Sequence, residues 1–189
     1  MNRRMARYRA VDLCLFALML FVFESIIITA SSRWFPGSPY TVSLTPAITA
    51  IVLVRWGPWA GVHAALGALV LCIESAAAPI QYAVYGLGNL FALAVLPCLR
   101  FSGGTEAVTR RSGAAIAFGL AVLILMQLGR ALIALGTGAA LPAAAGFFTT
   151  EVITDLFTLI LLWIVRRLDG LLEDQRHYLR RIREEQENS

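Results

Sequence analysis

Two carboxylates, Glu151 and Asp155, stand four residues apart within the apolar segment 147–165, so a helix places both on one face. A charged side chain inside a lipid bilayer is costly and therefore normally faces a partner, a cavity or water. Carboxylates in such a position bind donor groups of a ligand, pair with a buried cation, or assist hydrolysis. Arg130, in the preceding apolar segment, is a candidate cation. The acids therefore predict either a ligand site or a structural ion pair.

The residue types that are scarce or absent narrow the possible chemistry. All 16 basic residues are arginine, so no lysine is available for a P-loop, a Schiff base or a kinase-type site. The two histidines, His63 and His177, lie in different segments, and the three cysteines show no CxxC spacing. No nucleophile with an adjacent base is evident. We therefore expect a protein that is not an enzyme and that uses no metal or cofactor.

The composition indicates a membrane protein. The 189 residues are 58% hydrophobic and 15% charged, and the mean hydropathy is +0.71, which is too apolar for an ordinary soluble domain. The sequence predicts an all-α membrane protein, a compact bundle of six transmembrane helices, with the lipid bilayer and not nucleic acid as a partner. The expected substrate-binding domain covers 1–167, a charged cytoplasmic helical tail covers 168–189, and the six spans cover 11–32, 43–56, 59–75, 80–99, 112–136 and 147–165.

The distribution of arginine predicts the orientation of these spans. If the N-terminus is cytoplasmic, fourteen of the sixteen arginines fall on the cytoplasmic side, which leaves Arg33 outside and Arg130 within the membrane. Cytoplasmic loops of membrane proteins carry such an excess of basic residues. We therefore expect a multi-pass protein of the cell membrane with both termini in the cytoplasm.

With this orientation, polar residues inside the apolar segments gather in the outer half of the bundle. The inner half lacks a comparable set, which favours an outward-facing pocket over a continuous polar pore. We expect Glu151 and Asp155 to bind donor groups of a ligand, and Arg130 to hold one acid or bind an acceptor. Trp34 is expected to close over the site. The expected substrate-binding residues are Glu24, Trp34, Glu74, Tyr82, Tyr85, Asn89, Arg130, Glu151 and Asp155.

The charges of this expected pocket suggest its ligand. Four acids outnumber two arginines, Arg33 and Arg130. If all are ionised, a cationic or amine-bearing ligand is favoured, and a neutral ligand with several donors fits nearly as well. The fragment "GLGN" at 86–89 resembles a phosphate-binding loop, but it lies inside an apolar run without a preceding strand. We interpret it as a helix-packing segment.

Residues 43–70, "SLTPAITAIVLVRWGPWAGVHAALGALV", carry a resemblance to a known family. A polar, proline-containing entry leads to a short apolar run, a Gly-Pro turn and a span rich in small residues. This pattern resembles the substrate-binding S components of energy-coupling factor (ECF) transporters, as do the length, the six spans and the compact first external loop. The residues that carry the resemblance are Ser43, Pro46, Gly57, Pro58, Gly61 and Gly67.

The resemblance implies uptake of a vitamin or another small-molecule nutrient that binds from outside. It implies partners as well: a transmembrane T subunit and two cytoplasmic ATPase subunits, which would hydrolyse the ATP. S components dock through small residues spaced four apart on the first span, and the nearest match here is Ala6, Ala10 and Cys14.

A second class of function stays open on the sequence alone. The tail 168–189 is similar to juxtamembrane helices that relay signals or pair subunits, and small cell-shape scaffold proteins share this size and number of spans. The alternative prediction is therefore a membrane sensory or scaffold domain that acts through its cytoplasmic helical tail.

Overall fold

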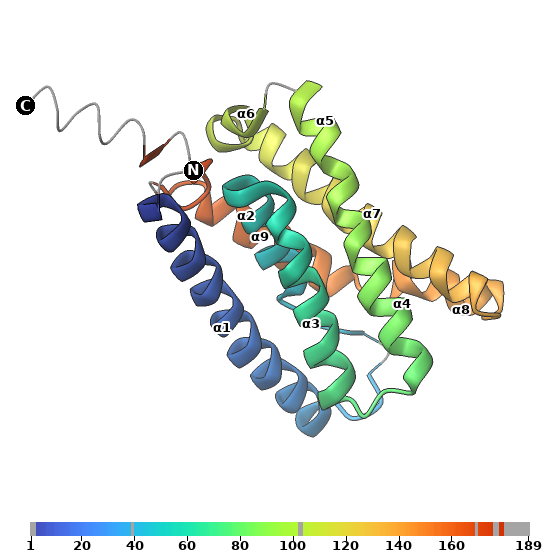
Figure 1. Cartoon of the computed structure of the whole chain (residues 1–189). Helices are drawn as coiled ribbons and strands as arrows, with labels where there is room; N and C mark the ends of the chain where they lie inside the picture. The colour runs from blue at the N-terminus through green and yellow to red at the C-terminus, as the bar shows by residue number, and fades with distance from the viewer. Residues whose placement is uncertain (1–2, 39, 102–103, 169, 176–177, 180–189) are drawn as a thin grey trace, which may run out of the picture.

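The computed structural model describes residues 3–38, 40–101, 104–168, 170–175 and 178–179, and every regular element among them is a helix. Figure 1 shows the long helices packed lengthwise, with the start of α1 at the upper left of the view. The predicted all-α class is thus confirmed. The elements are α1 (Arg3–Trp34), α2 (Thr45–Trp56), η1 (Gly57–Trp59), α3 (Ala60–Glu74), α4 (Pro79–Asn89), η2 (Leu90–Ala94), α5 (Val95–Phe101), α6 (Gly104–Arg110), α7 (Ser112–Gly136), α8 (Leu141–Thr149) and α9 (Val152–Val165), where η denotes a 3-10 helix.

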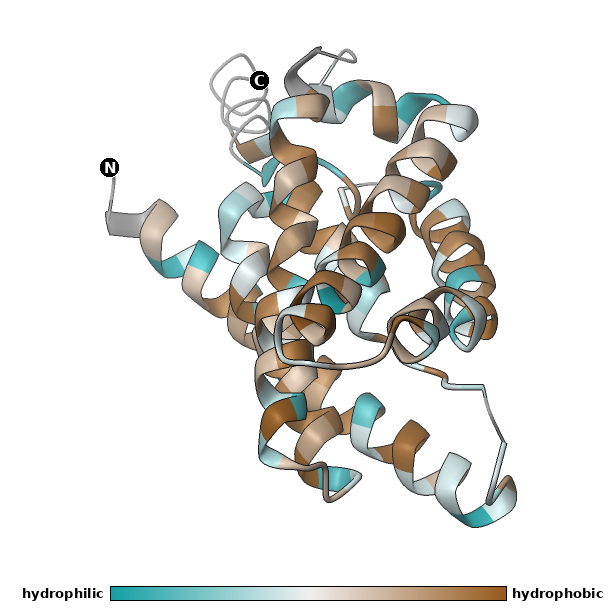
Figure 2. Ribbon diagram, turned by 90° about the vertical axis from the view of Figure 1, so that its right-hand side faces the viewer, coloured by the Kyte–Doolittle hydropathy of each residue, from teal (hydrophilic) through white to brown (hydrophobic). Residues whose placement is uncertain are grey.

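Five segments of the described chain are long and apolar enough to cross a membrane, and they are Met5–Trp34, Thr45–Glu74, Pro79–Leu99, Ser112–Gly136 and Leu141–Val165. Figure 2 shows the apolar residues distributed along all of these helices. The second segment is folded back on itself at η1, so α2 and α3 pack against each other (Figure 1). The 12 residues of α2 rise only about 18 Å, less than the ~30 Å of a hydrocarbon core.

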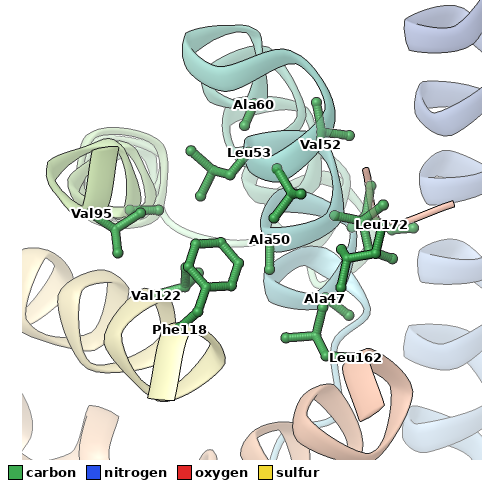
Figure 3. Close-up of a cluster of buried hydrophobic side chains, with 14 of the residues drawn as sticks. Ala47, Ala50, Val52, Leu53, Ala60, Val95, Phe118, Val122, Leu162 and Leu172 are labelled. Atoms are coloured by element: carbon green, nitrogen blue, oxygen red, sulfur yellow. The ribbon is translucent and has the colours of Figure 1, made fainter. Parts of the chain in front are cut away.

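The short helix α2 forms the centre of the bundle, and all of its residues are buried. A helix that is apolar on every side is stable only when neighbours cover it completely. Figure 3 shows Ala47, Ala50 and Leu53 of α2 facing Phe118 of α7 and Leu162 of α9. The surrounding helices α1, α3, α7 and α9 all contact it. The positions of these helices are therefore set by contact with α2.

Two expected spans are interrupted. The expected helix over 80–99 changes to a 3-10 helix at Leu90–Ala94, and the last helix begins earlier than expected, at Leu141, and breaks between Thr149 and Val152. No glycine or proline causes the second break. The hydroxyls of Thr149 and Thr150 both donate to the carbonyl of Gly146, at 3.2 and 2.9 Å, and such bonds compete with continuation of a helix.

The helices α4 and α7 approach closely where glycines meet. A Cβ atom at Gly88 would lie 2.7 Å from the Cα of Arg130, and a Cβ at Gly129 would overlap the carbonyl of Gly88 and the ring of Phe91. Only glycine allows two backbones to come this near. The interpretation of "GLGN" as a helix-packing segment is therefore confirmed.

The end of the bundle that holds the N-terminus carries a second polar cluster. Arg55 is 6% exposed and donates to both carboxylate oxygens of Asp12, at 3.0 and 2.7 Å. Its remaining nitrogen donates to the carbonyls of Gly170 and Leu171, at 2.7 and 2.8 Å. The expectation that this half lacks a comparable polar set is therefore wrong. Arg55 lies near the end of the expected span 43–56 and was counted among the arginines of the cytoplasmic side, whereas the fold buries it.

The chain after α9 folds onto this cluster. Gln175 is 1% exposed, donates to the carbonyl of Gly170 at 2.8 Å and accepts from the hydroxyl of Tyr8 at 3.3 Å. The hydroxyl of Thr109 donates to the carbonyl of Leu172 at 2.5 Å. Residues 170–175 are thus packed against the bundle. Most of the rest of the expected tail, 176–177 and 180–189, lies outside the described residues.

The close approach of α4 and α7 predicts that alanine substitutions at Gly88 and Gly86 change the free energy of unfolding in opposite directions. Gly88→Ala will lower the free energy of unfolding by about 1–3 kcal/mol, because the new methyl group overlaps the backbone of Arg130. Gly86→Ala on the same helix will raise it by up to ~1 kcal/mol, because nothing lies within 4 Å of its Cβ and alanine favours helix. Thermal unfolding of the purified protein measures both. Equal effects at the two positions would contradict the close approach of α4 and α7.

A second prediction concerns the Arg55 cluster. Arg55→Gln removes the ion pair with Asp12 and leaves the carbonyls of Gly170 and Leu171 with a weaker partner, so we expect the free energy of unfolding to fall by about 3–5 kcal/mol. Residues after Val165 will then become sensitive to limited proteolysis. Arg110→Gln is the control, because Arg110 forms an exposed ion pair with Glu106 at 2.9 Å, and such a pair contributes about 0–1 kcal/mol. Unchanged proteolysis in Arg55→Gln would show that Arg55 does not hold residues 170–175.

Candidate functional site

Arg130 lies at the centre of the candidate site, on α7 and 3% exposed. Its Nη1 forms an ion pair with the carboxylate of Glu151, and its Nε donates to Oδ1 of Asn89 at 2.6 Å. Glu151 is 6% exposed and Asn89 is 1% exposed. A buried charge is tolerated only when its hydrogen-bonding groups find partners. The guanidinium therefore joins α4, α7 and the start of α9 through charge-assisted hydrogen bonds.

The amide of Asn89 is oriented by a third helix. Its Nδ2 donates to the carbonyl of Ala64 on α3 at 3.1 Å, which leaves Oδ1 to accept from Arg130. Asn89 is the last residue of α4, immediately before the 3-10 helix η2. The change of helix type therefore occurs where the polar side chain turns towards α7.

An aromatic pair lies against the cation. The ring centroid of Tyr85 is 5.2 Å from Cζ of Arg130, within the range of a cation–π contact. Phe147 of α8 meets the same ring edge-on, with centroids 5.8 Å apart and planes at 85°. Tyr85 thus separates the buried ion pair from the residues around α8.

Asp155, the second acid of the segment 147–165, has a different partner. Asp155 accepts two hydrogen bonds from Nε2 of Gln127, at 2.9 and 3.0 Å, and it is partly buried. Glu151 lies at the N-cap position of α9, where the positive end of the helix dipole favours an anion. The two carboxylates therefore have distinct neighbours, Arg130 for Glu151 and Gln127 for Asp155.

Glu24 belongs to a separate hydrogen-bonded network. It is fully buried on α1, and its carboxylate accepts from the hydroxyl of Ser43 at 2.5 Å and from the amide of Leu44 at 2.7 Å. Thr154 of α9 extends this network, because its hydroxyl donates to the carbonyl of Thr41 at 2.9 Å and accepts from the amide of Ser43 at 3.1 Å. Glu24 therefore accepts hydrogen bonds from the residues at the start of α2, and both of its carboxylate oxygens already have protein donors.

Three expected site residues lie apart from the Arg130 group. Trp34 is 75% exposed at the end of α1, Tyr82 is 38% exposed on the first turn of α4, and Glu74 is exposed at the end of α3. The structure therefore brings four of the nine expected residues, Tyr85, Asn89, Arg130 and Glu151, into one contact group. Asp155 lies next to this group, one helical turn after Glu151.

The expected docking residues lie on the first helix as predicted. Ala10 and Cys14 are exposed, and Ala6 is partly exposed. Leu18, one turn further on, is 63% exposed. The opposite face of α1 is buried and carries Phe16, Leu20, Glu24 and Ile28. The small residues are thus on the face of α1 that points away from the bundle.

A pocket of about 380 Å³ opens beside Tyr85, between the start of α4, the end of α7 and α8. Of the nine expected residues only Tyr85 lines it. No lining residue is charged, so the excess of acids no longer supports a cationic ligand in this pocket. The lining residues are Ile80, Gln81, Val84, Tyr85, Ala134, Thr137, Gly138, Ala139, Ala143 and Phe147.

Several residues of these sites gave little signal in the sequence. Gln81, Thr137 and Ala143 line the pocket, but as ordinary residues near helix ends they carry no pattern that predicts a site. Asp12 is the second residue of the expected span 11–32 and follows four arginines, so it was not distinguished from a residue at the membrane surface. Within the described ranges, no group of three or more His, Cys, Asp or Glu side chains is placed to hold a metal ion.

The described chain is all-helical, and its apolar segments are compatible with a multi-pass membrane protein. A buried cluster of Arg130, Glu151 and Asn89 lies beside an open pocket. Comparison with protein family models, curated proteins and solved structures finds no match to this chain.

The buried ion pair predicts that substitutions of Arg130 and Glu151 have non-additive effects on stability. Arg130→Met will destabilise the fold by about 3–5 kcal/mol, because Glu151 is left as an uncompensated buried charge. Arg130→Met combined with Glu151→Leu will recover much of this loss, since no unpaired charge remains. Thermal unfolding of the two single variants and the double variant measures the coupling energy. Additive effects would mean that the two side chains do not interact, and the exposed Arg33→Gln serves as a control with little effect.

Proposed function

We propose that this chain is a membrane-embedded binding protein of the ECF S-component type, which captures a small nutrient in the pocket beside Tyr85. The observation that carries the proposal is the junction of an open pocket with a fully partnered polar cluster. Tyr85 lines the pocket and contacts Arg130, which is held by Glu151 and Asn89. A site whose wall is fixed by buried hydrogen bonds is preorganised for a ligand.

The pocket lining favours a neutral ligand. Its volume of about 380 Å³ lies in the range of small-molecule sites, roughly 300–1,000 Å³. Aliphatic side chains and the rings of Tyr85 and Phe147 supply apolar contact area, while Gln81 and Thr137 supply donors and acceptors. We therefore propose a vitamin-like or nucleobase-like compound with a flat apolar part and a few hydrogen-bonding groups, in preference to an amine.

The arginine distribution supports uptake from the outside. The pocket lies at the end of α7 away from Arg110 and Arg111, and the positive-inside rule, by which basic segments stay in the cytoplasm, supports an outward-facing pocket. By resemblance, the T subunit would dock on the exposed face of α1 that carries Ala10 and Cys14, and two cytoplasmic ATPase subunits would drive release.

One observation favours the rival class, a sensory or scaffold domain that acts through the tail. Gln175 and the carbonyls of Gly170 and Leu171 join the start of the tail to Tyr8 and Arg55. A displacement of α1 or α2 would therefore move the tail directly. This coupling has no necessary role in a nutrient-binding protein.

Ligand-induced stabilisation tests the proposal. The purified protein is heated with a panel of vitamins, nucleobases, amines and amino acids. A neutral compound present at about 100 times its Kd will stabilise the fold by about 2.7 kcal/mol and raise the melting temperature. Ala143→Phe will abolish the shift, because Ala143 lines the pocket and a phenyl ring fills part of it. Ala145→Phe is the matched control, an exposed position on the same helix that does not line the pocket.

Each result decides between the two classes. A shift that survives in Ala143→Phe would place the ligand elsewhere and reject this pocket. If no compound stabilises the protein, and a stable dimer is lost on deletion of residues 180–189, the sensory or scaffold class is supported instead. ATP-dependent uptake of the stabilising compound on co-expression with a T subunit and ATPases would establish the S-component type.

A further inference from the structure

The helices α7 and α9 run antiparallel and meet closely near the arginine-rich end. A Cβ atom at Gly119 would lie 2.8 Å from Cδ1 of Leu162 and 2.9 Å from Cδ2 of Leu159, so glycine permits this approach. As a result, the end of α9 reaches the start of α7, and Nη2 of Arg166 donates to the hydroxyl of Ser112. Among the described residues, the buried Nε of Arg166 has no hydrogen-bond partner. A half-buried guanidinium is thus held at this corner by the hydrogen bond of its Nη2 to Ser112.

The start of α7 has no internal anion. Arg111 at the N-cap position makes no side-chain cap, and the first turn holds no acid. The first amides of a helix have no partner within the helix and attract negative charge. Gly113 lies in this turn, and nothing occupies the space within 4 Å of a Cβ placed there. The backbone at this corner is therefore open to an approaching group.

Two further arginines flank the same corner. Arg111 is exposed, and Arg167 is exposed with its guanidinium 4.0 Å from the ring centroid of Trp163. Among the described residues, no ion pair joins a carboxylate to Arg111, Arg166 or Arg167. The neighbouring Arg110 differs, since it pairs with Glu106. Arg166 therefore contacts the start of α7 and Arg111 immediately precedes it in the chain, and among the described residues neither has an ion-pair partner.

An apolar surface continues from this corner along the bundle. On α7, Ile116, Leu120 and Ile124 follow Ser112 at four-residue steps and are 39%, 41% and 53% exposed. On α9, Ile160 and Ile164 are 57% and 50% exposed. A basic corner that leads into an exposed aliphatic surface matches a molecule with an anionic head and hydrocarbon chains.

We propose that this corner binds the headgroup phosphate of an anionic phospholipid. The phosphate oxygens accept from Arg166, Arg111 and the open amides at the start of α7, with Arg167 nearby. The acyl chains lie along the exposed residues of α7 and α9. The ligand, its location and the residues that hold it are separate from the nutrient pocket, which lies near the other end of α7, so the two proposals stand or fall independently.

The test compares lipids that differ in headgroup charge. The full-length protein in a mild detergent is titrated with phosphatidylglycerol, with phosphatidylcholine of the same chains, and with inorganic phosphate, and binding is followed by native mass spectrometry and by melting temperature. We expect phosphatidylglycerol to bind and stabilise, phosphatidylcholine to do so much less, and free phosphate to have no effect at the same concentration. Arg166→Gln combined with Arg111→Gln will weaken phosphatidylglycerol binding by about tenfold or more.

Gly113→Asp keeps the test decisive if the arginine variants fold poorly. Its carboxylate enters open space in the first turn of α7, where it supplies the missing anion. The lipid-free melting temperature will stay the same or rise, while the preference for phosphatidylglycerol is lost. Arg110→Gln is the matched control and keeps that preference, because Arg110 already pairs with Glu106. Equal binding of the two lipids, or a preference retained in Gly113→Asp, would overturn the proposal. Stabilisation by free phosphate alone would assign the corner to a soluble anion instead.

Discussion

The constraint on which much of the site depends is the burial of the Arg130 guanidinium within an apolar bundle. Arginine keeps its charge even when buried, so the surrounding chain must supply acceptors. Both acceptors come from places where a helix stops: Asn89 from the last residue of α4, and Glu151 from the break before α9. In an uninterrupted α-helix, the directions of the Asn89 and Glu151 side chains would be set only by the 3.6-residue repeat. The two interruptions therefore let the fold place an amide and a carboxylate around one cation.

A second set of contacts fixes the central helix α2 at both ends. Glu24 accepts from Ser43 and Leu44 at its start, and Asp12 accepts from Arg55 and Trp56 at its end. The two acids are twelve residues apart on α1, about 18 Å along a helix, which equals the length of α2. The carboxylate at the start and the arginine at the end also suit the direction of the helix dipole. This spacing sets the register of α1 against α2.

The two ends of the bundle consequently differ in chemistry. The end near the termini combines arginines with the packed segment 170–175, and it offers positive charge to its surroundings. The opposite end combines a neutral pocket with an internally compensated cluster, so little net charge is presented there. Long apolar helices connect the two, and α7 reaches from the basic corner at Ser112 to the pocket at Ala134.

The sequence by itself determined the helical class, the location of the apolar segments and the packing role of Gly88, because periodicity, length and the absence of side chains act locally. It also selected nine candidate site residues, since polar residues in apolar segments need partners, and four of them, Tyr85, Asn89, Arg130 and Glu151, meet in the structure. Only the tertiary structure decided which partner each one takes. It assigned Glu24 to the start of α2, Asp155 to Gln127 and Arg55 to Asp12, and it left Glu74 and Trp34 exposed. Those pairings depend on helix breaks, register and the fold-back of α2, which are set by contacts between residues far apart in the chain.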